Sequence, residues 1–401
     1  MYKKINAECR VYDIIIGNMM QSPLKSLDYF QKSYDIRVGQ LQEEKAKGTK
    51  IVGTFCLFVP DEIIFAAGAD RIVLCGGKTD TIARAEQSLP RNICPLIKSS
   101  FGAIVDACRN GSLSCPHVHL VDVVVAEATC DGKKKMYELL PEYLPTYVLD
   151  LPQKPCSPEA ITYFLSELRK FGKYLEDLTG NTIREKELKK QISSSNETRR
   201  LLHRLFDLRR RNPPPVTGSE VLRVMQKQFF LSPDQFREGV RQLCDEVEHR
   251  SPPSGSGPRI MISGCPMSAG NTKISDLVEQ KGGVIVVEES CTGTRSFWEL
   301  VDENKGPWTA LAERYLAIPC ACMTPNDQRI SRVVDLAQRY HVDGVVYYTL
   351  SFCHGYNIER LLVQKALKKE KIPLIAIESD YGDSDVEQIG VRIDAFLEMV
   401  S

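Results

Sequence analysis

The sequence predicts an α/β protein in which two parallel, doubly wound sheets are joined by a helical segment. Three observations predict this class. Short aliphatic runs recur in both halves of the chain, amphipathic helical patterns lie between these runs, and the middle of the chain has helical patterns alone. Because two neighbouring parallel strands need a crossover connection, helices that alternate with strands cover the faces of such sheets.

Eight buried strands are expected, four in each half of the chain. Their aliphatic runs are nearly continuous rather than alternating, as in "VDVVVAEAT" (121–129). This pattern is typical of parallel strands that are covered on both faces. The predicted strands are residues 50–55, 71–74, 121–129, 147–151, 259–263, 283–288, 344–351 and 373–377.

Helices are expected between the strands and throughout the middle of the chain. Ser157 and Pro158 form a good helix start, because a hydroxyl caps free N–H groups and proline suits the first helical position. "NPPP" (212–215) breaks the helical region, and "SPDQF" (232–236) restarts it. The helical patterns between strands include residues 60–69, 330–341 and 358–370.

The chain is predicted to divide into three parts. "SPPSGSGP" (251–258) is the clearest linker, because proline and glycine continue neither a helix nor a strand. We therefore expect an N-terminal α/β lobe in residues 1–156, a helical connector in residues 157–257 and a C-terminal α/β lobe in residues 258–401. A chain of 401 residues is long enough to give each lobe its own core.

Composition argues against several classes of protein. The chain carries 52 basic and 52 acidic residues, whereas a general nucleic-acid binder has a net positive charge or a basic stripe. It lacks the run of about 18 apolar residues that a membrane span needs, and its N-terminus lacks the apolar region of a secretion signal. A cytoplasmic location is expected. Fourteen cysteines in such a chain favour metal binding or redox chemistry over disulfides.

Six cysteines follow the carboxyl ends of predicted strands. Ligands bind at this edge of an open parallel sheet, because its loops diverge and helix N-termini point inward. Cys94 precedes a helix that begins with proline, where the helix dipole and free N–H groups favour a thiolate. Core packing explains a few such positions, but six or seven predict a site for a soft metal. The six are Cys56, Cys75, Cys130, Cys265, Cys291 and Cys353.

Spacing alone leaves the metal open. Cys320 and Cys322 form a close pair, but the chain has neither a C-x-x-C motif nor a ferredoxin-like run. Thiolates that are scattered along the chain suit an iron–sulfur cluster held between two lobes. As ligands we rank Cys56, Cys94, Cys130 and Cys353 first, Cys75, Cys320 and Cys322 next, and Cys265 and Cys291 last.

The other cysteines are expected to have no part in the site. Cys108 and Cys244 lie in helical patterns and are predicted to be core residues. Cys9, Cys115 and Cys156 lie in flanking loops without supporting geometry. Two histidines follow Cys115 in "CPHVH", but a zinc site there would need a fourth ligand that the sequence does not suggest.

With these residues in place, the chain resembles the family of benzoyl-CoA reductases and 2-hydroxyacyl-CoA dehydratases over nearly its whole length. Several blocks in the family's order make the resemblance specific, although each block alone would be weak. The resemblance implies two Rossmann/flavodoxin-like domains, an iron–sulfur cluster between them, and a separate ATP-hydrolysing iron–sulfur activator that supplies low-potential electrons. The blocks are "FCLFVPDEIIFAAGADRIVLCGG", "LPRNICPLIKSSFG", "TCDGKKKMYELL", "VDGVVYYTLSFCHGYNIE" and "IPLIAIESDYGDSDVEQIGVRIDAFLEM".

The positions that match the family's usual cubane ligands are Cys94, Cys130 and Cys353. The additional cysteines resemble the double-cubane branch of the family, whose cofactor is two [4Fe-4S] cubanes joined by one bridging sulfide, [8Fe-9S]. One iron of each cubane binds the bridge, so about six irons need protein thiolates. The resemblance implies that the ligands are Cys56, Cys75, Cys94, Cys130, Cys353 and one of Cys322 and Cys320, with Cys322 favoured and Cys291 in reserve.

The expected function is the ATP-dependent, low-potential reduction of a small molecule by a homodimer. Residues 263–273 do not end in the G-K-[ST] of a phosphate-binding loop, so a partner must hydrolyse the ATP. His354 is expected to donate protons or, alternatively, to orient the loop at Cys353. Glu62 is expected to be a charge at a helix N-terminus rather than an acid catalyst.

Two rival functions remain open. The first is a subunit of a 2-hydroxyacyl-CoA dehydratase or aryl-CoA reductase, with one [4Fe-4S] cluster and a CoA-thioester substrate. The second is a redox-inert α/β protein that binds zinc or no metal. The iron content of the protein separates all three.

Overall fold

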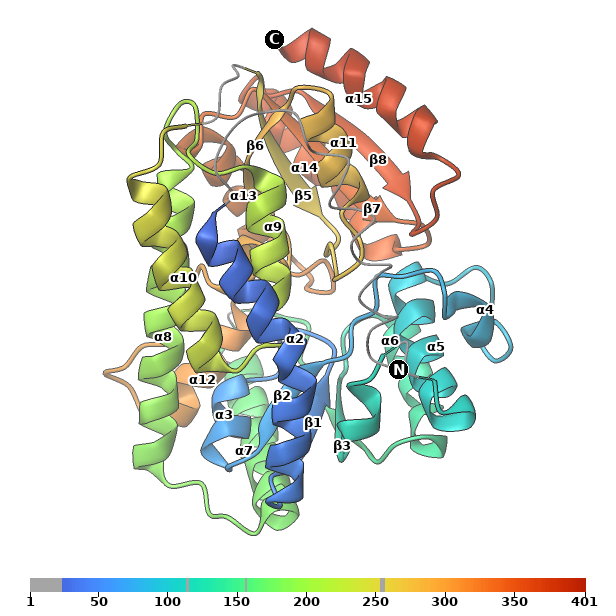
Figure 1. The fold of residues 1–401 in the computed structure, drawn as a ribbon, viewed down its shortest axis with the longest axis vertical. Helices are drawn as coiled ribbons and strands as arrows, with labels where there is room; N and C mark the ends of the chain where they lie inside the picture. Colours follow the sequence, from blue (N-terminus) through green and yellow to red (C-terminus); the bar gives the residue numbers. More distant parts are fainter. Residues whose placement is uncertain (1–23, 113–114, 156, 253–256) are drawn as a thin grey trace.

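The computed structural model describes residues 24–112, 115–155, 157–252 and 257–401. Within these ranges the chain forms two four-stranded sheets in which all strands are parallel (Figure 1). The predicted fold class is therefore confirmed, and each predicted strand is found within about two residues of its expected ends. The strands are β1 (Ile51–Thr54), β2 (Asp70–Val73), β3 (Val123–Glu127), β4 (Thr146–Leu149), β5 (Arg259–Gly264), β6 (Val284–Glu289), β7 (Gly344–Leu350) and β8 (Leu374–Ser379).

The two sheets share one topology. Their strand orders are β2-β1-β3-β4 and β6-β5-β7-β8, so in each sheet the first strand lies between the second and the third. Flavodoxin-like sheets begin with the same order. In both sheets the chain reverses its direction of winding between the first and third strands, and open sheets of this kind bind ligands at the carboxyl ends of those strands.

Helices cover the sheets and form the whole middle of the described chain. Those of the first half are α2 (Lys25–Ala46), α3 (Asp61–Ala66), α4 (Ile82–Ala85), α5 (Pro95–Asn110) and α6 (Asp131–Tyr137). The middle has α7 (Pro158–Thr179), α8 (Glu185–Leu208), α9 (Gly218–Lys227) and α10 (Pro233–Glu248). The second half has α11 (Lys273–Gln280), α12 (Pro307–Leu316), α13 (Asp327–Arg339), α14 (His354–Lys369) and α15 (Val386–Val400).

The predicted helix starts in the middle segment are confirmed. The Ser157 hydroxyl accepts a hydrogen bond from the N–H of Ala160, at 3.1 Å, and Pro158 occupies the first position of α7. Ser232 caps α10 in the same way, and Gln235 completes a reciprocal capping box with it. Cys9, Cys156 and residues 253–256 of the predicted linker lie outside the described ranges.

Alternate residues of each strand point to opposite faces of the sheet and contribute to different hydrophobic cores. On β3, Val123 and Val125 pack beneath α3, α7, α8 and α12, whereas Val124 and Ala126 pack with α5 and α6 on the opposite face. The residues on both faces of β3 are buried, which explains why the aliphatic run in the sequence is continuous. The second sheet repeats this arrangement, with α11 and α15 on one face and α9, α10, α13 and α14 on the other.

Two helices pack on cores that lie far from them in the sequence. Near the start of the described chain, α2 packs against α9 and α10, and its Phe30 joins the core beneath the second sheet. Helix α12 packs against α7, and its Leu311 joins the core of the first sheet. Helices α8 and α10 run beside both lobes (Figure 1). The predicted bounds of the three parts stay a prediction, and α2 and α12 tie the parts together.

The carboxyl edges of the two sheets meet. Gly77, in the loop after β2, touches the loop after β5 so closely that a Cβ there would lie 2.6 Å from the carbonyl oxygen of Ala269. A side chain at this position would push the two loops apart. The loops that follow the strands of one sheet therefore face those of the other.

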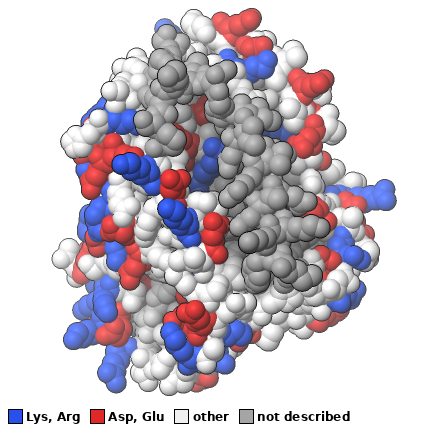
Figure 2. Space-filling view, in the orientation of Figure 1, with Lys and Arg blue, Asp and Glu red and all other residues white. Residues whose placement is uncertain are grey.

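Basic and acidic side chains are interspersed on the face of the molecule drawn in Figure 2. This arrangement agrees with the equal numbers of basic and acidic residues in the sequence. No helix in the described part of the chain combines the length and the apolarity that a membrane span needs.

Candidate functional site

Four cysteines lie just beyond the carboxyl ends of the inner strands of the two sheets. In the first sheet, Cys56 follows β1, and Cys130 follows β3 at the N-cap of α6. In the second sheet, Cys265 follows β5, and Cys353 follows β7 at the N-cap of α14. In each sheet, the two cysteines lie on either side of the point where the strand order reverses. Sheets of this type bind ligands at that point.

Hydrogen bonds join the thiols of the two lobes directly. Cys56 of the first lobe pairs with Cys291, which follows β6 in the second lobe. Cys94, at the N-cap of α5, pairs with Cys353, and Cys353 also pairs with Cys265. Thiols from loops of both sheets therefore interact with one another, and their convergence on one metal centre stays a prediction.

Further contacts join the remaining thiols to this group. Cys320 and Cys322, in the loop between α12 and α13, are hydrogen-bonded to each other. Cys322 interacts electrostatically with Cys56 and Cys130, and Cys75 does so with Cys291. We call these nine described residues the thiol site: Cys56, Cys75, Cys94, Cys130, Cys265, Cys291, Cys320, Cys322 and Cys353. Their role as metal ligands stays a prediction.

The other described cysteines lie outside the thiol site. Cys244 is buried in α10, as predicted, and its sulfur donates to the carbonyl oxygen of Leu201 at 3.5 Å. The prediction that Cys108 is a core residue is wrong, because this cysteine lies on the exposed side of α5. Cys115 is half-buried, close to the buried imidazole of His117.

The thiols differ strongly in acidity. Hydrogen bonds from Cys265 and Cys94 hold the pKa of Cys353 well below its usual range. A hydrogen bond from Cys322, with the positive charge of Arg295 in addition, lowers the pKa of Cys320 to about 6. Burial instead raises the pKa of Cys75 to about 12. The site thus contains thiols that ionise readily, and a thiolate is the form that binds metal.

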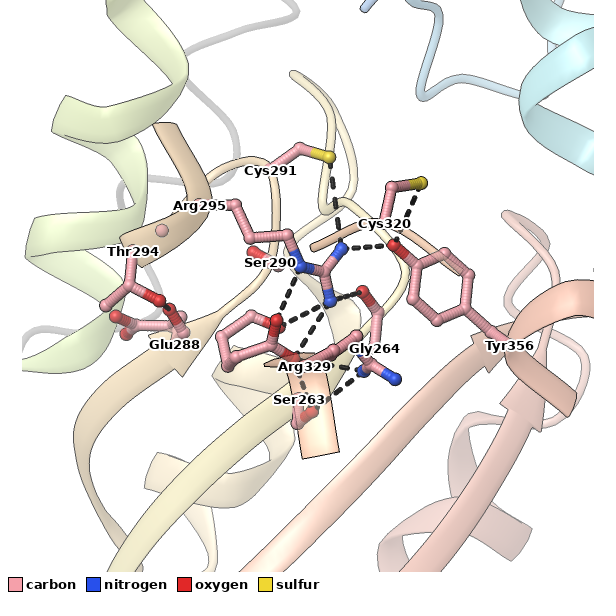
Figure 3. A network of polar contacts seen from close by, with 12 residues as sticks. Ser263, Gly264, Glu288, Ser290, Cys291, Thr294, Arg295, Cys320, Arg329 and Tyr356 are labelled. Carbon is pink, nitrogen blue, oxygen red and sulfur yellow. Dashed lines mark hydrogen bonds and ion pairs between the residues drawn. The ribbon is translucent and has the colours of Figure 1, made fainter. Parts of the chain in front are cut away.

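A buried network of charges lies beside Cys291 and Cys320 (Figure 3). Arg295 forms a double hydrogen bond with the carboxylate of Glu289, at 2.5 and 2.9 Å. Arg329 pairs with the same carboxylate at 3.0 Å. All three side chains are almost fully buried, so their charges are screened little by solvent.

Two donors of this network reach the sulfur atoms. The guanidinium Nη1 of Arg295 lies 4.0 Å from the Sγ of Cys291 and also donates to the hydroxyl of Tyr356. That hydroxyl lies 3.7 Å from the Sγ of Cys320. Donors that face sulfur ligands stabilise negative charge on them and tune the potential of a bound cluster. Nothing in the sequence alone singles out Arg295, because its place beside the site depends on the fold.

In the first lobe, Lys133 supplies a further buried positive charge. Its ammonium group binds the carboxylate of Glu127 at the end of β3, and both groups are almost inaccessible to solvent. This positive charge acts to lower the pKa of Cys56 and Cys75, against the larger opposing effects on both thiols. The thiol site therefore lies between fixed cations of both lobes.

His354 is the first residue of α14, and its side chain is exposed. Its charge helps to lower the pKa of Cys353, after the larger effects of Cys265 and Cys94. The imidazole is thus adjacent to a thiol of the site, and its role as a proton donor stays a prediction.

A cavity of about 150 Å³ adjoins the thiol site where both lobes meet the helical connector. Cys56, Cys75 and Cys291 contribute to its lining. Phe229 and Phe230, which follow α9, contribute as well. The cavity also has four basic side chains in its lining, namely Arg71, Lys133, Arg199 and Arg314.

The donor set consists of thiols, which are the soft ligands that bind iron–sulfur clusters in proteins. Among the described residues, no group of three or more His, Cys, Asp or Glu side chains is arranged to hold one ion. A cluster has a different requirement, because each of its irons takes one thiolate and the ligands come from separate loops. The thiols of this site come from loops of two facing sheets, and their binding of a cluster stays a prediction.

Comparison with known proteins identifies similar chains. The family model described as "2-hydroxyglutaryl-CoA dehydratase, D-component" matches residues 56–400. The putative dehydratase subunit YjiM of Escherichia coli is 37% identical over 382 residues, which cover 93% of this chain and 97% of that protein. The beta subunit of (R)-phenyllactyl-CoA dehydratase from Clostridium sporogenes is 24% identical, over 88% of this chain and 92% of that protein. A benzoyl-CoA reductase subunit from Thauera aromatica is 20% identical, over 91% of this chain and 95% of that protein.

Proposed function

Because the chain belongs to the 2-hydroxyglutaryl-CoA dehydratase D-component family, as its sequence blocks predicted, we propose that it is an iron–sulfur reductase with a double-cubane cofactor. The observation that carries the proposal is the thiol site itself. It gathers nine thiols from both lobes, whereas a single [4Fe-4S] cluster takes about four ligands at most. A cofactor with about six protein ligands uses this surplus.

We propose the ligand set that the sequence suggested. It comprises Cys56, Cys75, Cys94, Cys130, Cys353 and one residue of the hydrogen-bonded pair Cys320 and Cys322, with Cys322 favoured. Cys291 remains the reserve ligand, and its hydrogen bond to Cys56 supports that role. When bound, the [8Fe-9S] cofactor would store electrons and deliver them at low potential.

The residues around the thiols would adjust that chemistry. Arg295 and Tyr356 would stabilise negative charge on the sulfur atoms of Cys291 and Cys320, because their donor groups face these atoms. Lys133 would do the same for Cys56 and Cys75 from the first lobe. His354 would supply protons beside Cys353.

The electrons would come from a partner. We propose a separate ATP-hydrolysing iron–sulfur activator that docks transiently, and a homodimer in the cytoplasm as the working assembly. The loop between β5 and α11, which runs from Cys265 to Thr272, carries no phosphate-binding motif, so ATP hydrolysis is assigned to the partner.

The names of the relatives support a second candidate. They include subunits of a phenyllactyl-CoA dehydratase and a benzoyl-CoA reductase, so a subunit with one [4Fe-4S] cluster and a CoA-thioester substrate is the alternative. Such a subunit would leave most of the nine thiols without a role as ligands.

Iron and acid-labile sulfide analysis decides between these candidates, together with a low-temperature EPR spectrum of protein purified without oxygen. The proposal expects about eight irons per chain, and the alternative expects about four. A colourless protein without iron would overturn both.

A further inference from the structure

The cavity beside the thiol site contains hydrogen-bond donors that the protein does not use. Arg71 is 8% exposed, and its Nη2 pairs with the carboxylate of Asp61 at 2.5 Å, but its Nε has no partner among the described residues. The side-chain amide nitrogen of Gln228 is buried and likewise has no partner in the described chain. Both residues line the cavity, and Arg71 donates to the carbonyl oxygen of Gln228 at 3.2 Å. Buried donors are nearly always paired, so these two indicate an acceptor that binds from the cavity.

The charges around the cavity do not balance. Three of its four basic side chains have carboxylate partners, because Arg71 pairs with Asp61, Arg199 with Glu62 and Lys133 with Glu127. In each of these three ion pairs, a carboxylate of the protein is the counterion of the basic side chain. The fourth basic side chain is Arg314.

Arg314 is 6% exposed and donates to two carbonyl oxygens, those of Ser296 at 2.7 Å and Glu299 at 3.3 Å. Within the described residues, no carboxylate lies within ion-pair distance of its guanidinium. Burial and the neighbouring Arg199 lower its pKa to about 10, so it is still charged at neutral pH. The carboxylates of Glu62 and Glu299 act on Arg314 only from beyond that distance, and Glu62 already pairs with Arg199. An anion in the cavity would supply the near counterion that a buried cation needs.

The volume limits what can bind. A cavity of about 150 Å³ holds a molecule of about six non-hydrogen atoms, the size of benzene. A whole CoA thioester is many times larger. The cavity therefore suits a small ligand, and its donors and charge suit an anion.

We infer that the cavity binds a small carboxylate, held by Arg314, by the Nε of Arg71 and by the side-chain amide of Gln228. A carboxylate presents two oxygens that accept several N–H groups at once, as these three residues require. It would lie beside Cys56, Cys75 and Cys291, which line the same cavity. Its role as the substrate of this site rests on the proposed function, whereas its binding does not.

Calorimetric titration tests the inference on protein purified without oxygen whose iron content has been measured. The probes are acetate and acetamide, which have nearly the same shape but differ in charge. We expect acetate to bind and acetamide to bind at least about tenfold more weakly, since hydrogen bonds to charged groups are the stronger ones. Equal binding of the two probes, or no binding of acetate to protein with its full iron content, overturns the inference.

Two variants locate the site. Arg314→Gln removes the charge, and Gln228→Leu removes an amide that has no partner within the described protein, so the second variant breaks no internal hydrogen bond of that nitrogen. Each is expected to weaken acetate binding about tenfold. The matched controls are Arg200→Gln and Gln242→Leu, which change exposed residues of α8 and α10. Unchanged acetate affinity in Gln228→Leu overturns the inference even if Arg314→Gln fails to fold.

The iron measurement separates this inference from the proposed function. Protein without iron that still binds acetate, and loses this binding in Gln228→Leu, supports the carboxylate site and overturns the proposed function. Protein that has about eight irons per chain and does not bind acetate supports the proposed function and overturns the carboxylate site.

Discussion

The guanidinium of Arg295 lies 4.0 Å from the sulfur of Cys291 while it holds the buried carboxylate of Glu289 through two hydrogen bonds. One side chain thus joins the core of the second lobe to the thiol site. Its surroundings fix its position, because Arg329 and Ser263 bind the same carboxylate from other directions. Changes at Arg295 should therefore affect both the stability of the lobe and the thiols.

Arg295→Met is expected to lower the free energy of unfolding by about 3 kcal/mol. The change leaves the carboxylate of Glu289 buried with one cation fewer, and breaking a buried ion pair costs about 3–5 kcal/mol. Urea denaturation measures the loss. Arg200→Met is the matched control, because its ion pair with Glu303 is exposed and should be worth about 1 kcal/mol or less. Equal losses in the two variants would contradict the prediction.

Cys130→Ser and Cys353→Ser are each expected to lower the iron content by about half or more, since each would release one cubane of the proposed cofactor. Iron analysis of protein purified without oxygen measures the loss. Cys108→Ser should keep the full iron content, because Cys108 lies on the exposed side of α5, outside the thiol site. A Cys130 variant with all of its iron would remove this residue from the ligand set.

In iron-free protein, Cys320 is expected to react with iodoacetamide at pH 7 and to lose this reactivity as the pH falls below about 6. Its pKa of about 6 leaves it mostly as the nucleophilic thiolate at pH 7. Cys322→Ala removes the hydrogen bond that contributes most to this pKa. The rate of alkylation at pH 7, followed by peptide mass spectrometry, should then fall about tenfold. An unchanged rate would show that Cys322 does not control the acidity of Cys320.

Acid is expected to destabilise the protein through His117. Burial, with a smaller effect of Arg37, lowers the pKa of this histidine to about 4, whereas in the unfolded chain it is about 6.5. Both states are neutral above pH 6.5. As the pH is lowered from 6.5 to 4, the unfolded state takes up the proton first. The free energy of unfolding therefore decreases, and at pH 4 it is about 3 kcal/mol lower than at neutral pH.

His117→Phe tests this linkage. Phenylalanine keeps the ring contact with Phe230, whose ring centroid lies 5.4 Å away, and cannot be protonated. The difference in unfolding free energy between variant and wild type should grow by about 3 kcal/mol from pH 7 to pH 4, as measured by urea denaturation at both pH values. A difference that does not change with pH would mean that His117 takes up its proton equally in both states.

The strands and the ends of the sheets could be predicted because their signals are local. A parallel strand covered on both faces must be apolar throughout, as Val123–Glu127 nearly is, so the sequence itself marks its position. The carboxyl end then has a fixed place in the fold, which explains why cysteines that follow strands, such as Cys56 and Cys353, could be expected at one edge.

Contacts between distant segments could not be predicted in this way. Cys291 ranked low as a ligand, yet it pairs with Cys56 because two separate sheets face each other. Glu62 was expected to be a charge at a helix end and does lie in the first turn of α3, but it is fully buried and pairs with Arg199 of α8. Nothing near Glu62 in the sequence indicates this partner.

The prediction for Cys108 was wrong in the other direction, because a residue that was expected to be buried is exposed. Its place in an apolar helical pattern predicted burial, but α5 turns this residue toward solvent. One cysteine contributes too little hydrophobic area to decide which side of a helix faces the core, and its neighbours in the tertiary structure decide instead.

Helix α12 opposes any motion that separates the two lobes. It comes from the second half of the chain, yet Leu311 is buried in the core of the first sheet, and the hydroxyl of Tyr315 donates to the carboxylate of Glu62 at 2.7 Å. A hinge motion that parted the lobes would have to extract this helix from the core. The two halves, produced as separate polypeptides, would therefore each expose an apolar surface that the other normally shields from water.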